Sequence, residues 1–168
     1  MPAPGPPDSH HLSAAVGWLE LGNHVEAGEE LAKISAPVLE HPDVLEVRWA
    51  VCAAGKSWEA ALSVAELLLR KAPERSSGWL HRAYAVRRVR EGGLHQAWEA
   101  LRPAFEKFPQ DWLIAYNLAC YAAQFGRSEE AWEWLFKATA ASGDVSRIKR
   151  MALADADLQP LWERIETL

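Results

Sequence analysis

Residues 126–135 read Gly-Arg-Ser-Glu-Glu-Ala-Trp-Glu-Trp-Leu, and the pattern within them decides the fold. A glycine is followed after four residues by an alanine, and after three more by an aliphatic residue. The same pattern occurs three times upstream: Gly22, Ala27, Leu31; Gly55, Ala60, Val64; and Gly92, Ala97, Leu101. Successive alanines are 33, 37 and 34 residues apart (27, 60, 97, 131). A period near 34 is typical of helix–turn–helix repeats.

Each part of the pattern has a physical role. The glycine ends a first helix, because a left-handed backbone there costs no Cβ clash. The alanine lies early in a second helix and allows two helix backbones to approach closely. The aliphatic residue, one turn later, fills the space between the helices. Pro42, Pro73 and Pro109 fall just beyond the second helices, where a helix must stop.

The repeats divide the chain into helix pairs. We expect a flexible leader over 1–11, four pairs within 12–42, 43–76, 77–110 and 111–143, and capping helices within 144–168. The expected helices are 12–22 with 24–40, 43–54 with 57–71, 77–91 with 94–107, and 111–125 with 128–141. Pro37 predicts a kink or break near Ala36. Further helices are expected over 146–153 and 157–168, with Asp155 as a cap.

Charge is unevenly distributed along this mildly acidic chain. The net charge is -5, yet residues 1–46 hold eight acidic residues against one basic, and residues 70–90 hold seven basic against one acidic. An acidic chain does not suit bulk nucleic-acid binding, which needs a dominant basic face. The basic segment 70–90 fits an acidic partner through electrostatic steering, or is simply a solvated helix face.

Composition also bears on location and chemistry. No apolar run approaches the about 20 residues of a membrane span, and residues 1–11 lack the features of a secretory signal. We expect a cytoplasmic protein whose Cys52 and Cys120 are free thiols. The six histidines lack metal-ligand spacing, and no P-loop or nucleophile elbow occurs. The sequence therefore predicts a non-enzymatic protein with no cofactor and no metal.

The repeats resemble the tetratricopeptide repeat family. The fourth copy is the most similar, with Ala115-Tyr116-Asn117-Leu118-Ala119-Cys120-Tyr121 followed by Gly126, Glu130-Ala131, Leu135 and Lys137-Ala138. The tail over 151–162 is similar to the closing segment after some bacterial arrays of this family. The resemblance covers roughly residues 12–168 and implies an all-α, right-handed solenoid of about four helix pairs plus C-terminal capping helices. It also implies a concave groove, lined by the first helices, that takes a peptide or helix.

Helical geometry proposes which side chains line that groove. The alanines Ala115, Ala119 and Ala122 share the packed face of the fourth first helix, so the neighbouring face is left to bind. Applied to the second, third and fourth pairs, this reasoning places Glu46 in the groove lining and selects these binding residues: Trp49, His81, Tyr84, Arg87, Arg88, Tyr116, Asn117 and Gln124. Aromatic residues and arginine often anchor interfaces, and arginine holds carboxylates well. We therefore expect a protein or peptide ligand with acidic character.

Three alternatives remain open at this point. The aromatic residues of the predicted groove can instead be core residues of stacked helices, as we expect for Trp18, Trp58, Trp98, Trp132 and Trp134. Some tetratricopeptide domains hold the C-terminus of a peptide with a two-carboxylate clamp. Asn117 matches one residue of that clamp, but the Lys–Asn pair expected one repeat earlier is replaced by His81, Tyr84 and Arg88. Finally, the chain can be a homo-oligomeric structural module that stacks through its apolar C-terminal segment: Leu158, Leu161, Trp162 and Ile165.

Overall fold

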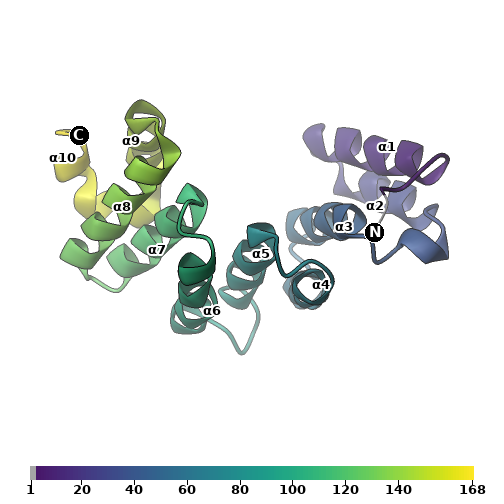
Figure 1. Ribbon diagram of the computed structural model, residues 1–168, viewed down its shortest axis with the longest axis horizontal. Coiled ribbons are helices and arrows are strands. Elements are labelled where there is room, and N and C mark those ends of the chain that lie inside the picture. The colour runs from purple at the N-terminus through teal and green to yellow at the C-terminus, as the bar shows by residue number, and fades with distance from the viewer. Residues whose placement is uncertain (1–2) are drawn as a thin grey trace. The chain divides into compact units, whose positions relative to one another are not determined.

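The computed structural model describes residues 3–168, and these residues form helices and turns without a strand (Figure 1). The first four helices are α1 (Asp8–Glu20), α2 (His24–Ala32), α3 (Pro42–Ala54) and α4 (Trp58–Lys71). They are followed by α5 (Ser76–Val86), α6 (Leu94–Lys107), α7 (Trp112–Gln124) and α8 (Ser128–Ser142). The chain ends with α9 (Val145–Ala154) and α10 (Trp162–Ile165), and short 3₁₀ helices occur at η1 (Ala36–Val38) and η2 (Ala156–Leu161). The predicted all-α class is confirmed.

The chain divides into two compact units, and each is described by itself. The N-terminal unit runs to Ala97, and the C-terminal unit comprises Trp98–Leu168, so the boundary falls within α6. In the N-terminal unit, α1 packs on α2, α3 on α4, and α4 on α5. In the C-terminal unit, α7 packs on α8, and α9 packs on α8. This packing of consecutive helices is consistent with a helical repeat.

One alanine marks the same position in each second helix. Ala27, Ala61, Ala97 and Ala131 are all fully buried. Each donates its backbone N–H to the residue that precedes its helix: Asn23, Ser57, Gly93 and Arg127, at 2.9–3.2 Å. These alanines are 34, 36 and 34 residues apart (27, 61, 97, 131). The structure therefore shows a more even repeat than the sequence pattern did.

The second copy of the pattern was assigned one residue too early. Ala60 is exposed, and Ala61 takes the buried place. The reason lies in the turn: Lys56, and not Gly55, adopts the left-handed conformation, with φ of 56°. Gly22 and Gly126 do the same in the first and fourth copies, with φ of 76° and 74°. Because lysine is rare in this conformation, the glycine next to it misled the assignment.

Lys56→Gly is expected to raise the free energy of unfolding by about 0.5–1 kcal/mol, because glycine removes the Cβ clash of the left-handed backbone. Gly126→Ala is the matched reverse change and is expected to lower it by about 1 kcal/mol. Urea denaturation followed by circular dichroism measures both. A Lys56→Gly protein less stable than wild type would contradict the assigned turn.

The N-terminal leader is shorter than expected. Helix α1 already begins at Asp8, so residues 8–11 of the predicted flexible leader are helical. The Asp8 carboxylate accepts hydrogen bonds from the Ser35 backbone N–H and hydroxyl, both at 2.7 Å, and so ties the start of α1 to the segment after α2. Met1 and Pro2 of the predicted leader lie outside the described residues.

Three predicted helices are shorter in the structure. The helix expected over 24–40 ends at Ala32, before the predicted break near Pro37, and η1 follows it. The helix expected over 157–168 is divided into η2 and α10. The helix expected over 77–91 ends at Val86, because the chain then turns tightly through Gly92, where a Cβ would lie 1.8 Å from the Val86 carbonyl oxygen. This turn holds the two extra residues of the third repeat.

Apolar side chains from several helices form the core of each unit. In the N-terminal unit the buried residues group into Ala15, Ala27, Leu31, Ile34 and Val44 with Trp18 packed beside them, and into Leu45, Val64, Leu68 and Ala72 with Trp49 beside them. In the C-terminal unit the largest fully buried side chains are Leu101, Ile114, Leu118, Leu135, Ile148, Leu158 and Ile165. None of the described helices combines the length and apolar character needed to cross a bilayer.

The apolar C-terminal segment closes onto its own unit. Leu158 and Ile165 are fully buried and Leu161 is 3% exposed. The Trp162 ring N–H donates to the Ala152 carbonyl at 3.0 Å. Three of the four apolar residues named above for stacking on a second copy are therefore buried within the chain, and Trp162 is half-buried.

Candidate binding site on helices α3 and α5

The candidate site lies where α3 and α5, the first helices of the second and third pairs, pack against each other. The buried His41 side chain starts α3 by accepting the Asp43 backbone N–H at 3.2 Å, and Pro42 occupies the first helical turn. Residues three or four positions apart then share a face. On α3 this face carries Glu46 and Trp49. The facing surface of α5 carries Ser77, His81 and Tyr84.

An aromatic stack and a carboxylate join the two helices. The Trp49 and His81 rings are stacked, with centroids 3.7 Å apart and planes 8° apart. The His81 ring also makes a polar contact, since its Nε2 lies 2.6 Å from Glu46 Oε2. The Ser77 hydroxyl donates to the second oxygen of Glu46. Glu46 therefore holds α5 against α3 from both of its oxygens.

The Glu46 carboxyl stays ionised to lower pH than an ordinary glutamate. Its burial raises the pKa, but the hydrogen bonds from His81 and Ser77, together with the nearby charge of Arg75, outweigh this effect and leave the pKa below the usual 4.5. Because the folded-state pKa is lowered, the stabilisation is fully present above about pH 4.5 and is lost as pH falls through the folded-state pKa.

Glu46→Gln is expected to lower the free energy of unfolding at pH 7 by about 1 kcal/mol, because it removes charge-assisted hydrogen bonds. The difference from wild type should shrink as pH falls from 5 to 3. Urea midpoints across this range measure the effect. Glu129→Gln serves as control, since Glu129 also pairs with an arginine but its side chain is 82% exposed. A difference between wild type and Glu46→Gln that does not change with pH would contradict the role of the Glu46 charge.

Tyr84 and Arg88 form the exposed part of the site. The Tyr84 ring is 39% exposed and meets Trp49 edge-on at 5.9 Å and Trp58 at 5.8 Å. The Arg88 guanidinium lies 3.4 Å from the centroid of the Tyr84 ring and donates to the Tyr84 carbonyl at 2.9 Å. Within residues 3–168 no carboxylate pairs with Arg88. Arg87, the next predicted residue, is the C-cap of α5.

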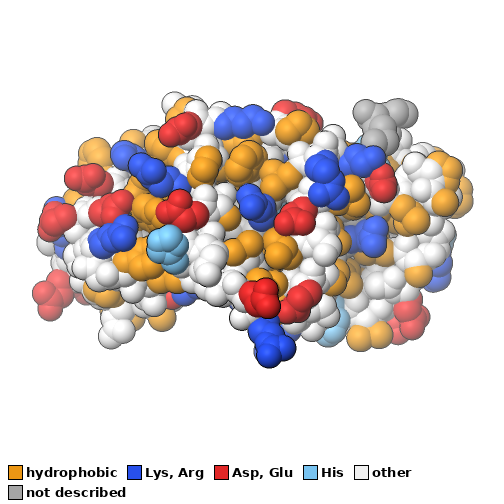
Figure 2. Space-filling view, turned by 90° about the horizontal axis from the view of Figure 1, so that it is seen from below, with side chains coloured by type: hydrophobic (Ala, Val, Ile, Leu, Met, Phe, Trp, Pro, Cys, Tyr) orange, Lys and Arg blue, Asp and Glu red, His pale blue; other side chains and the backbone are white. Residues whose placement is uncertain are grey.

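Neighbouring basic residues are already engaged. Lys71 pairs with Glu40 at 2.5 Å, and Arg75 pairs with Asp43 at 2.7 Å. The acidic N-terminal part of the sequence thus neutralises part of the basic segment 70–90. On the face drawn in Figure 2, Lys and Arg side chains alternate with Asp and Glu. Arg88 has no such carboxylate partner among residues 3–168, and its guanidinium lies beside the exposed Tyr84 ring.

Of the three predicted residues of α7, Tyr116 is buried, Asn117 is half-buried and Gln124 is exposed. Tyr116 is 5% exposed, and its hydroxyl donates to Asp155 at 3.1 Å. The Gln124 amide donates to the Asp157 carbonyl at 3.1 Å, and the Asn117 amide donates within α7 to Leu113 at 2.8 Å. The chain's own η2 covers this face of α7. The physical reason is that η2 buries its leucines against α7 while Asp155 caps η2, as the sequence predicted.

Burial affects the Tyr116 hydroxyl. Desolvation, and then the neighbouring Cys120 and Asp155 side chains, raise the pKa of Tyr116 well above its usual range. The hydroxyl therefore stays protonated and can donate to Asp155. Both cysteines are free, with Cys120 buried and Cys52 half-buried.

Two residues of the site were not predicted to bind. Trp58 was expected in the core, yet it contacts Tyr84 and lies 5.2 Å from the Arg88 guanidinium. Ser77 had no signal in the sequence, since its role depends on α5 meeting Glu46. The five predicted residues of the N-terminal unit, Trp49, His81, Tyr84, Arg87 and Arg88, lie on α5, at its end, or on the facing side of α3.

The site on α3 and α5 combines aromatic surface with the Arg88 cation. Across residues 3–168, no three His, Cys, Asp or Glu side chains gather to hold a metal ion. Comparisons with protein-family models and with curated proteins give no match for this chain. The function is therefore argued from the site alone.

Proposed function

We propose that this chain is a non-enzymatic protein-interaction module of the tetratricopeptide type, a right-handed helical solenoid, and that α3 and α5 bind a peptide segment carrying a carboxylate. The observation that carries the proposal is the pairing of Tyr84 with Arg88. An exposed aromatic ring and a guanidinium without a carboxylate partner among the described residues lie within 3.4 Å of each other.

Arg88 is held in place before any ligand arrives. Its hydrogen bond to the Tyr84 carbonyl and its position over the Tyr84 ring restrict its rotamers. Preorganisation of this kind lowers the entropy cost of binding. Tyrosine and arginine are also among the residues that most often dominate interface energetics. The cluster therefore suits a ligand that brings a carboxylate to Arg88 and apolar surface to Tyr84.

The paired charges around the site support specificity for one carboxylate. Glu46 is satisfied by His81 and Ser77, and Arg75 is satisfied by Asp43. A highly acidic ligand would bring further carboxylates close to the Glu46 and Asp43 carboxylates, which already have their partners. A short segment with one acidic residue beside an apolar residue matches the surface more closely.

Selection from a displayed peptide library tests the proposal. Wild-type protein should enrich peptides that place Asp or Glu next to an apolar residue. Each selected peptide, titrated into ¹⁵N-labelled protein, should shift amide resonances of α3 and α5. Enrichment without acidic residues, or shifts confined to the C-terminal unit, would overturn the proposed site.

A further inference from the structure

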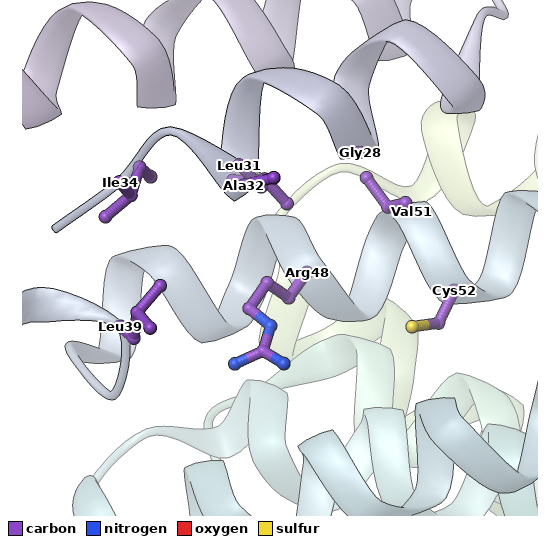
Figure 3. A pocket seen from close by; sticks show the side chains of 8 residues that line it. All are labelled: Gly28, Leu31, Ala32, Ile34, Leu39, Arg48, Val51 and Cys52. Carbon is purple, nitrogen blue, oxygen red and sulfur yellow. The ribbon is translucent and has the colours of Figure 1, made fainter. Parts of the chain in front are cut away.

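A second site is suggested by a cavity between α2 and α3 in the N-terminal unit (Figure 3). Its volume is about 340 Å³. Helix α2 contributes Gly28 and Leu31, the following segment contributes Leu39, and α3 contributes Arg48 and Val51. Apart from Arg48 and Cys52, the lining residues are glycine or have hydrocarbon side chains. The cavity therefore suits an apolar ligand with one polar end.

Gly28 widens the cavity without a structural need for glycine. It lies inside α2, where glycine is a poor helix former, and its backbone has no positive φ. A Cβ at this position would meet only Val51 Cγ1, at the ordinary contact distance of 3.7 Å. Neither the backbone conformation nor close packing therefore requires a glycine at position 28. The evident effect of Gly28 is the open space that it leaves at the wall of the cavity.

Arg48 supplies a cation to this cavity. Its side chain is half-buried, and no hydrogen bond or ion pair reaches it within residues 3–168. The Glu40 carboxylate feels the charge of Arg48, but it already pairs with Lys71 at 2.5 Å. In Figure 3 the guanidinium stands on the side of α3 away from α2. Arg48 therefore lines the cavity from α3, and its guanidinium points away from α2.

We propose that this cavity binds a medium-chain aliphatic carboxylate. The hydrocarbon chain lies against Leu31, Leu39 and Val51, and the carboxylate meets the Arg48 guanidinium at the rim. At roughly 30 Å³ for a water-sized group, the cavity holds on the order of ten such groups, similar to the heavy atoms of decanoate. One cation at one end of an apolar wall matches one charge at one end of the ligand. The proposal does not depend on the α3/α5 peptide site.

Titration with decanoate below its micelle concentration tests the proposal. Decanoate should bind with a Kd of about 1 mM or lower and shift the amide resonances of Gly28 and Val51. Arg48→Met, which keeps an apolar side chain, should weaken binding about tenfold or more. Decanol, the uncharged analogue, should bind wild type as weakly as decanoate binds Arg48→Met.

Two controls keep the test decisive. Arg82→Met removes another half-buried arginine of the N-terminal unit that lies outside the cavity, and it should leave decanoate binding unchanged. Gly28→Leu fills the cavity and should abolish the shifts while the helical circular dichroism is retained. Equal binding by wild type and Arg48→Met, equal binding of decanol and decanoate to wild type, or shifts outside α2 and α3 would overturn the proposal. So would the absence of binding at 10 mM decanoate.

Discussion

Leu158→Ala is expected to lower the free energy of unfolding of the C-terminal unit by about 3 kcal/mol. Leu158 is fully buried and belongs to η2, which packs on α7. Truncation leaves a cavity against a helix whose middle residues are mostly buried, including Leu118 and Ala122. The surrounding helix has little room to collapse into this space, so the cost should lie in the usual range for a buried leucine.

Hydrogen exchange of backbone amides measures this effect and locates it. Amides of α7 and α8 should exchange faster in Leu158→Ala, and amides of α1 and α2 should change little, since they belong to the other compact unit. Phe136→Ala is the control, because Phe136 is 62% exposed and its loss should cost at most about 0.5 kcal/mol. A loss below about 1 kcal/mol in Leu158→Ala would show that η2 is not an integral part of the core.

Arg88→Ala is expected to weaken binding of a selected acidic peptide about 30-fold. The variant removes both the charge-assisted hydrogen bond to the ligand and the guanidinium that lies over Tyr84. Arg88→Lys should recover only part of the loss, because an ammonium lacks the planar surface that stacks on the ring. Fluorescence anisotropy with labelled peptide gives the dissociation constants.

A matched arginine on an aromatic ring separates a local effect from a general one. Arg147 lies 4.7 Å from the centroid of Trp112 in the C-terminal unit. Arg147→Ala removes this arginine–aromatic pair and changes the net charge by the same amount as Arg88→Ala. It should leave peptide affinity within twofold of wild type. Equal weakening in Arg88→Ala and Arg147→Ala would indicate attraction to overall charge and would argue against the α3/α5 site.

The sequence predicted the helix pairs because their spacing is a local property. Ala27, Ala97 and Ala131 are buried as the repeated pattern predicted. The second copy was misassigned by one residue because the choice between Gly55 and Lys56 depends on backbone conformation, and composition favours the glycine. Helix ends such as Val86 were missed for a related reason, since a tight turn rather than a breaking residue ends α5.

The candidate site was predicted in part. Trp49, His81 and Tyr84 meet because each lies on the predicted face of its helix. Tyr116 also lies on the predicted face of its helix. There, however, it is covered by η2, which comes about 40 residues later in the chain. No periodic pattern reports which segment docks on a face, because docking depends on contacts between distant residues. Charge counting had a similar limit, since it did not show that Arg75 pairs with Asp43.

The segment that covers α7 acts as a tethered ligand. Asp155 and Asp157 reach Tyr116 and Gln124 from within the same chain, so this contact is intramolecular. A tether of this kind gives an effective concentration on the order of millimolar. A free peptide that competes for the same face at micromolar concentration must therefore bind it about a thousand times more tightly than η2 does. This competition supports the proposal that an outside peptide binds the face of α3 and α5 rather than that of α7.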